Sequence, residues 1–152
     1  MKKVCIALDY TPLSAKVAET GYSFAKAIGA EVTLIHVITD AAFYDAYCVP
    51  NMGYTPILTP SDPLGVDDVE DVAEEFLSTA ISRLSDQGVN KVILEGSTAD
   101  AILEFASENH MDLIVLGTHG HSGLEHLLLG NTAGRIVKYS TIPLLIVPTG
   151  NS

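Results

Sequence analysis

Glycines cluster in one late segment of the chain, at a spacing suited to holding an anion. Gly117 and Gly120 are separated by two residues, and Gly130 follows after nine more, directly before the polar residues Asn131 and Thr132. Glycine allows positive φ values and close approach of the backbone, so that several amide groups can point at one anion. The start of a helix after Gly130 would add free N–H groups at the same place. This spacing predicts a phosphate-binding loop, although glycine-rich turns also serve as plain strand-to-helix connections.

The overall charge opposes such a ligand, so the site must supply its own donors. The formal net charge is -11, with only eight lysine and arginine residues in the chain. Phosphate backbones and anionic lipids are bound mainly through dense lysine and arginine, which makes nucleic acid and membrane surfaces poor candidate partners. Hydrogen bonds to charged groups contribute about 1.5–3 kcal/mol each, and four or five of them could support a micromolar complex at about -8 kcal/mol.

Strand-like and helix-like segments alternate along the chain, and together they would place this loop at one edge of a sheet. Such alternation implies right-handed βαβ units, and hence an α/β fold with a mostly parallel sheet and helices on both faces. In an open sheet of this kind the ligand crevice lies beyond the carboxyl ends of the strands. The expected strands are residues 4–8, 32–37, 91–94, 113–116 and 144–147.

The helices between these strands are predicted from apolar residues spaced mostly three or four positions apart. The first helix should bury one stripe and end at Gly29, and the second should end at Gly88. The apolar positions are Val17, Gly21, Phe24 and Ile28 in the first helix, Val69, Val72, Phe76 and Leu84 in the second, Ile102, Phe105 and Ala106 in the third, and Ala133, Ile136 and Val137 in the fourth.

Length and composition fit one globular domain over residues 1–149, followed by a short tail at 150–152. Hydrophobic residues make up 47% of the chain and charged residues 18%, whereas disorder needs low hydrophobicity together with high charge. The apolar N-terminal stretch is too short for a signal peptide, and no run reaches the roughly 18 residues of a membrane helix. Cys5 and Cys48 lie in unlike contexts, so no disulfide framework is predicted. A cytoplasmic location is the default expectation.

A long variable loop, residues 39–65, interrupts the alternation. It contains several tyrosines and four prolines and is too long for an ordinary connection. One interpretation is a mobile excursion or an arm that packs against a partner, and the other is a lid over the crevice. The sequence does not discriminate between them.

Metal-binding and hydrolase alternatives have less support. His119, His121 and His126 invite a metal-site interpretation, but no cysteine or carboxylate pattern completes a ligand set. The segment around Ser122 is similar to a serine-hydrolase nucleophile elbow, but Leu124 stands where the last glycine of that motif belongs.

The glycine spacing from Gly117 to Gly130 resembles the ATP-binding signature of the universal stress protein family. Other segments resemble the family as well, namely 9–14 after the first strand, 34–37 in the second, 112–117 in the fourth and 142–148 in the last. The likeness covers nearly the whole chain. It implies a Rossmann-like, five-stranded sheet of order 3-2-1-4-5, of the adenine nucleotide alpha hydrolase-like type, with Asp9 and Gly117 on opposite sides of the switch point.

The resemblance also implies roles for single residues. An aspartate at the position of Asp9 approaches the ribose or adenine, the backbone at Val37 meets the adenine edge, and the glycine loop holds the phosphates. The ligand implied is ATP, or AMP or ADP, together with Mg²⁺. Asn131 departs from the family's serine or threonine, which removes a hydroxyl contact but keeps a favoured helix cap. The expected nucleotide-binding residues are Asp9, Tyr10, Thr11, Val37, Gly117, Thr118, His119, Gly120, Gly130, Asn131 and Thr132.

Two functional interpretations follow from these features. The first is a nucleotide-responsive stress or signalling protein with at most slow hydrolysis, since no Walker lysine and no Mg²⁺ carboxylate cage is evident. The second is a dimeric stress protein that acts through protein contacts without nucleotide. Both predict a homodimer, because the last strand would be an apolar sheet edge with unpaired backbone groups. The residues of that edge are Leu144, Leu145, Ile146 and Val147.

Overall fold

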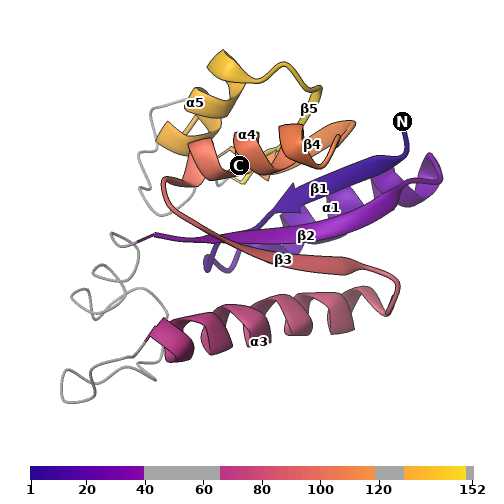
Figure 1. Ribbon diagram of the computed structural model, residues 1–152. Helices are drawn as coiled ribbons and strands as arrows, with labels where there is room; N and C mark the ends of the chain where they lie inside the picture. The colour runs from indigo at the N-terminus through magenta and orange to yellow at the C-terminus, as the bar shows by residue number, and fades with distance from the viewer. Residues whose placement is uncertain (40–65, 119–128, 150–152) are drawn as a thin grey trace.

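A five-stranded parallel sheet organises the chain in a computed structural model that describes residues 1–39, 66–118 and 129–149 (Figure 1). The strands run in the order β3-β2-β1-β4-β5, and every pairing is parallel. The predicted α/β fold and the order 3-2-1-4-5 are therefore confirmed. The strands are β1 (Lys3–Ala7), β2 (Glu31–Ile38), β3 (Asn90–Glu95), β4 (Leu113–Gly117) and β5 (Leu144–Val147). The helices are α1 (Ser14–Ala27), α3 (Val66–Leu84), α4 (Thr98–Glu108) and α5 (Asn131–Tyr139).

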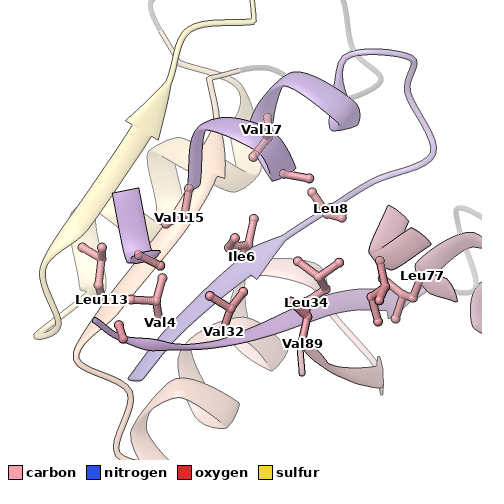
Figure 2. Packing of buried hydrophobic residues seen from close by; sticks show 14 of the residues in the cluster. Val4, Ile6, Leu8, Val17, Val32, Leu34, Leu77, Val89, Leu113 and Val115 are labelled. Carbon is pink, nitrogen blue, oxygen red and sulfur yellow. The ribbon is translucent and has the colours of Figure 1, made fainter. Parts of the chain in front are cut away.

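The two faces of the sheet are covered by different helices. Successive residues of a strand point to opposite faces. Ile6 of β1 therefore packs in one cluster with Val17 of α1 and Leu77 of α3 (Figure 2). Cys5, its neighbour in the strand, packs in the other cluster with Ile136 of α5 and with residues of α4. Because helices bury both faces, the central strands β1 and β4 are apolar over consecutive residues, as the sequence predicts, whereas β2 also buries Thr33 and His36.

Cys5 lies in the middle strand of the sheet and is fully buried. Its Sγ lies 3.7 Å from the carbonyl oxygen of Leu113 in the neighbouring strand β4. Burial raises the pKa of the Cys5 thiol from 9.0 to about 12. The thiol is therefore a core group and stays protonated and unreactive in the folded protein.

Helix α1 approaches the sheet closely at Gly21. A Cβ atom at this position would lie 2.9 Å from Ile6 Cδ1 and 2.9 Å from Val115 Cγ1. Both of these side chains are fully buried in the sheet, so neither can move aside easily. The absence of a side chain at Gly21 therefore sets the distance between helix and sheet.

This close approach changes which side of α1 faces the core. The predicted stripe is correct at Val17 and Gly21 but wrong at Phe24 and Ile28, whose side chains are 41% and 38% exposed. Small residues face the sheet because only they fit at this distance, and the large apolar ones lie at the flank. Val137 of α5, also expected in the core, is 44% exposed. The buried positions of α1 are Val17, Ala18, Gly21 and Ala25.

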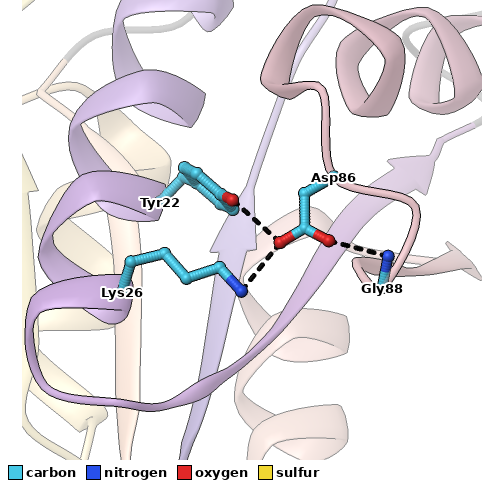
Figure 3. A network of polar contacts seen from close by, with 4 residues as sticks. All are labelled: Tyr22, Lys26, Asp86 and Gly88. Atoms are coloured by element: carbon cyan, nitrogen blue, oxygen red, sulfur yellow. Dashed lines mark hydrogen bonds and ion pairs between the residues drawn. The ribbon is translucent and has the colours of Figure 1, made fainter.

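A polar network joins α1 to the turn between α3 and β3 (Figure 3). Lys26 Nζ lies 2.7 Å from Asp86 Oδ2, and the Tyr22 hydroxyl donates to the same oxygen at 2.8 Å. The backbone N–H of Gly88 donates to Asp86 Oδ1, also at 2.8 Å. The hydrogen bond from Lys26, with those from Tyr22 and Gly88, lowers the pKa of Asp86 to about 2. The carboxylate thus holds the two segments together on the side of the sheet covered by α1 and α3.

The helix ends agree only partly with the glycine positions. Helix α1 is followed by Gly29 at a φ of 68°, as predicted. Helix α3 ends at Leu84, before Gly88, because Ser85 adopts the left-handed conformation with a φ of 55°. Gly88 instead completes the turn around Asp86, so its prediction as a helix stop was wrong. Within the described residues, none of the helices is both long and apolar enough to span a membrane.

Candidate anion site at the carboxyl edge of the sheet

Three neighbouring strands bring several of the expected site residues to one edge of the sheet. β1 lies between β2 and β4, so the segments after their carboxyl ends meet at the same edge. Asp9 follows β1, Val37 lies near the end of β2, and Gly117 ends β4. The chain leaves β1 toward α1 on one face and leaves β4 toward α5 on the other face. The boundary between β1 and β4 is therefore the switch point of the sheet, with Asp9 and Gly117 on its two sides.

Asp9 is oriented by the residue two positions further along the chain. Its Oδ1 accepts hydrogen bonds from the backbone N–H of Thr11 at 3.0 Å and from the Thr11 hydroxyl at 2.5 Å. This local turn fixes the carboxylate before the chain enters α1. A carboxylate held in this way can accept further hydrogen bonds from ligand hydroxyl groups, such as those of a sugar.

Tyr10 lies in an aromatic cluster between β1, β2 and α3. Its ring centroid is 4.2 Å from that of His36 and 4.9 Å from that of Phe76. His36 is 5% exposed, and its Nδ1 lies 2.8 Å from the carbonyl oxygen of Leu8. No role was predicted for His36 from the sequence. It directly precedes Val37 in β2, so its side chain points to the opposite face of the sheet, which α3 covers. The cluster supports the ends of β1 and β2 from one face.

Val37 is buried on the opposite face, among residues of α4 and β4. Its side chain is 6% exposed and therefore belongs to the core. The next residue, Ile38, accepts a hydrogen bond through its carbonyl oxygen from the N–H of Gly96 at 3.1 Å. A contact of Val37 with a ligand would accordingly come from its backbone.

Thr118 joins the two ends of the glycine loop. Its carbonyl oxygen accepts a hydrogen bond from the N–H of Gly130 at 2.7 Å, and its own N–H donates to the carbonyl oxygen of Val147 at 3.0 Å. The end of β4, the end of β5 and the start of α5 therefore meet at this residue. The amino end of α5 is thereby placed beside Gly117, as an anion site made from both would require.

Gly117 is needed for close packing. A Cβ atom there would lie 2.9 Å from Thr149 Cγ2 and 3.1 Å from Val17 Cγ2. Neither described glycine of the loop adopts a positive φ, since Gly117 is outside the left-handed region and Gly130 has a φ of -67°. At Gly117 it is therefore the close packing, and not a positive φ, that requires glycine.

Gly130 is the N-cap residue of α5 and precedes the first helical residue. As a glycine it has no side chain that could cap the helix. Asn131 is that first residue and Thr132 the second, so the prediction of Asn131 as the cap was wrong by one position. Both side chains are exposed. The first amide groups of a helix have no acceptor within the helix and are available to an anion.

Arg135, one turn into α5, is directed toward α4. Its Nε lies 2.9 Å from Asp100 Oδ1, and both side chains are about half exposed. This ion pair holds the guanidinium beside α4, so the donors that the described residues offer at the loop are mainly backbone amides and short hydroxyl side chains.

Two of the expected nucleotide-binding residues, His119 and Gly120, lie outside the described residues. The same holds for the other two histidines of the metal-site alternative, His121 and His126, and for nearly all of the long loop. The structure therefore places nine of the eleven expected residues: Asp9, Tyr10, Thr11, Val37, Gly117, Thr118, Gly130, Asn131 and Thr132.

A separate pocket lies between α1 and α3. It has a volume of about 160 Å³ and is lined by Thr11, Phe76 and Arg83, among others. Of the expected nucleotide-binding residues, only Thr11 lines it. The pocket is on the α1 and α3 side of the sheet, away from the start of α5.

Several solved structures share this fold. The hypothetical protein MJ0577 of Methanocaldococcus jannaschii matches with a TM-score of 0.73 and 22% identity, over 99% of this chain and 98% of its own. A universal stress protein in complex with cAMP matches with a TM-score of 0.66 and 18% identity, over 96% of each chain. The universal stress protein from Archaeoglobus fulgidus in complex with dAMP gives 0.64 and 20%, over 96% of this chain and 97% of its own.

Sequence comparison agrees with the fold. The model of the universal stress protein family matches residues 1–148. A universal stress protein of Methanocaldococcus jannaschii, MJ0531, is 32% identical over 148 residues, which cover 96% of this chain and 81% of that protein. The family model includes both sides of the switch point and the whole of the glycine loop. The chain therefore belongs to the universal stress protein family.

Proposed function

We propose that this protein binds ATP at the carboxyl edge of the sheet, with the phosphates at the loop between Gly117 and Gly130. One observation carries the proposal: the hydrogen bond from Gly130 N–H to the Thr118 carbonyl oxygen places the amino end of α5 beside the end of β4. Backbone donors from a strand end and a helix start then face one place, where the helix dipole favours negative charge. The cAMP and dAMP complexes of two proteins with this fold support an adenine nucleotide as the ligand.

The rest of the nucleotide would extend across the switch point toward β2. In this arrangement Asp9 accepts hydrogen bonds from the ribose or the adenine, and the backbone at Val37 meets the adenine edge. Mg²⁺ would accompany the phosphates and offset part of the net charge of -11. The segment from Gly117 to Asn131 contains no lysine that could contact the transferred phosphate. We therefore expect binding with at most slow hydrolysis and a role in nucleotide-responsive stress signalling.

Calorimetric titration of nucleotide-stripped protein with ATP and Mg²⁺ tests this function. We expect a dissociation constant in the micromolar range, about -8 kcal/mol, because four or five charge-assisted hydrogen bonds must also offset the cost of ordering the ligand. AMP and ADP serve as comparison ligands. A protein concentration of about 100 μM is well above a micromolar dissociation constant, so binding of this strength would be detected. If no heat is detected, the alternative gains support, namely a dimeric stress protein that acts through protein contacts alone.

We also propose that the protein forms a two-fold homodimer through the edge strand β5. On each face of the sheet, a covering helix carries an exposed apolar side chain. Phe24 of α1 is 41% exposed, and Val137 of α5 is 44% exposed. Arg135 faces α4, and Val137 lies two residues further, about 200° around the helix and away from α4. Strand β5 and these two exposed side chains would form one apolar surface that a second copy can cover.

Sedimentation of the protein at roughly tens of micromolar tests the dimer. We expect the wild-type protein to sediment as a dimer, and Val137→Glu to sediment as a monomer because the interface would bury its charge. Lys138→Glu is the matched control, since this exposed neighbour on the same helix points to solvent. A monomeric wild-type protein, or a dimeric Val137→Glu variant, would count against this interface.

A further inference from the structure

Thr149 lies at the start of the candidate phosphate loop, although it follows β5 and is absent from the expected site. It is 4% exposed. Its backbone N–H donates to Thr118 Oγ1 at 3.0 Å, and the two threonine hydroxyl oxygens are 3.1 Å apart. Its Cγ2 occupies the space where Gly117 would carry a side chain. The residue therefore contacts both the last residue of β4 and the first residue after it.

Three polar groups of Thr118 are used to connect three elements. The N–H binds the carbonyl oxygen of Val147 at the end of β5, the hydroxyl binds Thr149, and the carbonyl oxygen binds Gly130 at the start of α5. Thr118 is partly buried, and all three bonds are made by this one residue, so they depend on one another for their geometry. Without the hydroxyl bond, Thr118 would be held less firmly, and its carbonyl oxygen would be less well fixed toward Gly130.

We propose that Thr118 and Thr149 are positioning residues of the anion site. Together they hold the amino end of α5 against the end of β4, so that the first amide groups of α5 face the phosphates before the ligand arrives. Preorganisation of this kind raises affinity by lowering the ordering cost of binding. This inference rests on the proposed nucleotide binding and extends it to a residue outside the glycine loop.

Four variants separate positioning from packing. Thr118→Val removes the hydroxyl oxygen that accepts the hydrogen bond from the Thr149 N–H. Thr149→Val removes only the Thr149 hydroxyl, since the N–H of residue 149 and its methyl group near Gly117 are kept. Thr118→Ser keeps the hydroxyl and should restore binding. Thr33→Val is the matched control, because Thr33 is also a buried threonine, 6% exposed, but lies toward the amino end of β2.

Calorimetry with ATP and with adenosine gives the main readout. We expect ATP to bind about tenfold more weakly to Thr118→Val and about threefold more weakly to Thr149→Val, in keeping with the loss of single hydrogen bonds. Adenosine carries no phosphate, so its affinity should stay unchanged in both variants. Thr118→Ser and Thr33→Val should bind both ligands like the wild-type protein.

Amide hydrogen exchange without nucleotide gives a second, independent readout. The Gly130 amide should exchange faster in Thr118→Val than in Thr33→Val, because its acceptor is no longer fixed. Equal losses for ATP and adenosine, or unchanged ATP affinity, would overturn the positioning role. A wild-type protein that binds no ATP would refute the proposed function. Hydrogen exchange would then be the remaining test of the positioning role, and a Gly130 amide equally protected in Thr118→Val and in the wild-type protein would refute that role.

Discussion

Gly21→Ala is expected to lower the free energy of unfolding by about 1–2 kcal/mol, even though alanine is the better helix former. The added Cβ would lie 2.9 Å from Val115 Cγ1 and from Ile6 Cδ1, both buried in the sheet. Helix α1 must then move away from the sheet or displace these side chains. Domains of this size are stable by only about 5–15 kcal/mol, so the loss would be evident in urea denaturation.

Gly134→Ala provides the matched control. Gly134 also lies inside a helix, α5, but among the described residues no atom outside that helix lies within 4 Å of its ideal Cβ position. Alanine should therefore stabilise the protein by about 0.5–1 kcal/mol through its higher helix propensity. If both variants changed stability in the same direction, close packing of α1 on the sheet would not be the cause.

Gly130→Val is expected to weaken ATP binding by about a hundredfold or more, the equivalent of losing one or two charge-assisted hydrogen bonds. The φ of -67° and ψ of 170° at Gly130 are open to any residue, so the backbone itself need not change. The branched side chain would instead cover the amide groups at the start of α5. Calorimetry with ATP and Mg²⁺ measures the change.

Two further variants show whether the helix start itself is responsible. Gly130→Ala adds a single carbon and should produce a smaller loss of ATP affinity than valine. Gly134→Ala lies one turn further along α5 and should leave ATP affinity as it is. If Gly130→Val melts like the wild type and binds ATP with unchanged affinity, the phosphates do not bind at this end of α5.

The fold was predictable because its strands carry a simple signal. Continuous apolar runs such as Leu113–Leu116 indicate strands buried on both faces, and their alternation with helical patterns indicates a parallel sheet. The order of the strands, in contrast, came from the family resemblance. Nothing in the apolar pattern of β1 records that its neighbours are β2 and β4, since all three strands are buried alike.

The helix faces and the details of the site were harder to predict. Periodicity assigned Phe24 to the core because it is large and apolar, but the distance set by Gly21 admits only small residues. Thr149 was missed because its role depends on a contact with Thr118, 31 positions earlier, which no local pattern reveals. The glycine-rich segment does lie between β4 and α5, but its spacing could not separate positive φ from close approach as the reason for Gly117.

The burial of Cys5 gives the protein an internal reporter of global opening. Alkylating reagents react with the thiolate, and this thiol forms one only when β1 separates from its neighbours. Its labelling rate, read from the peptide that carries Cys5, therefore follows the population of opened molecules. A ligand that binds only the native state reduces that population by the factor 1 + [L]/Kd. Slower alkylation of the middle strand would thus identify a bound nucleotide among candidate cell metabolites without any label on the ligand.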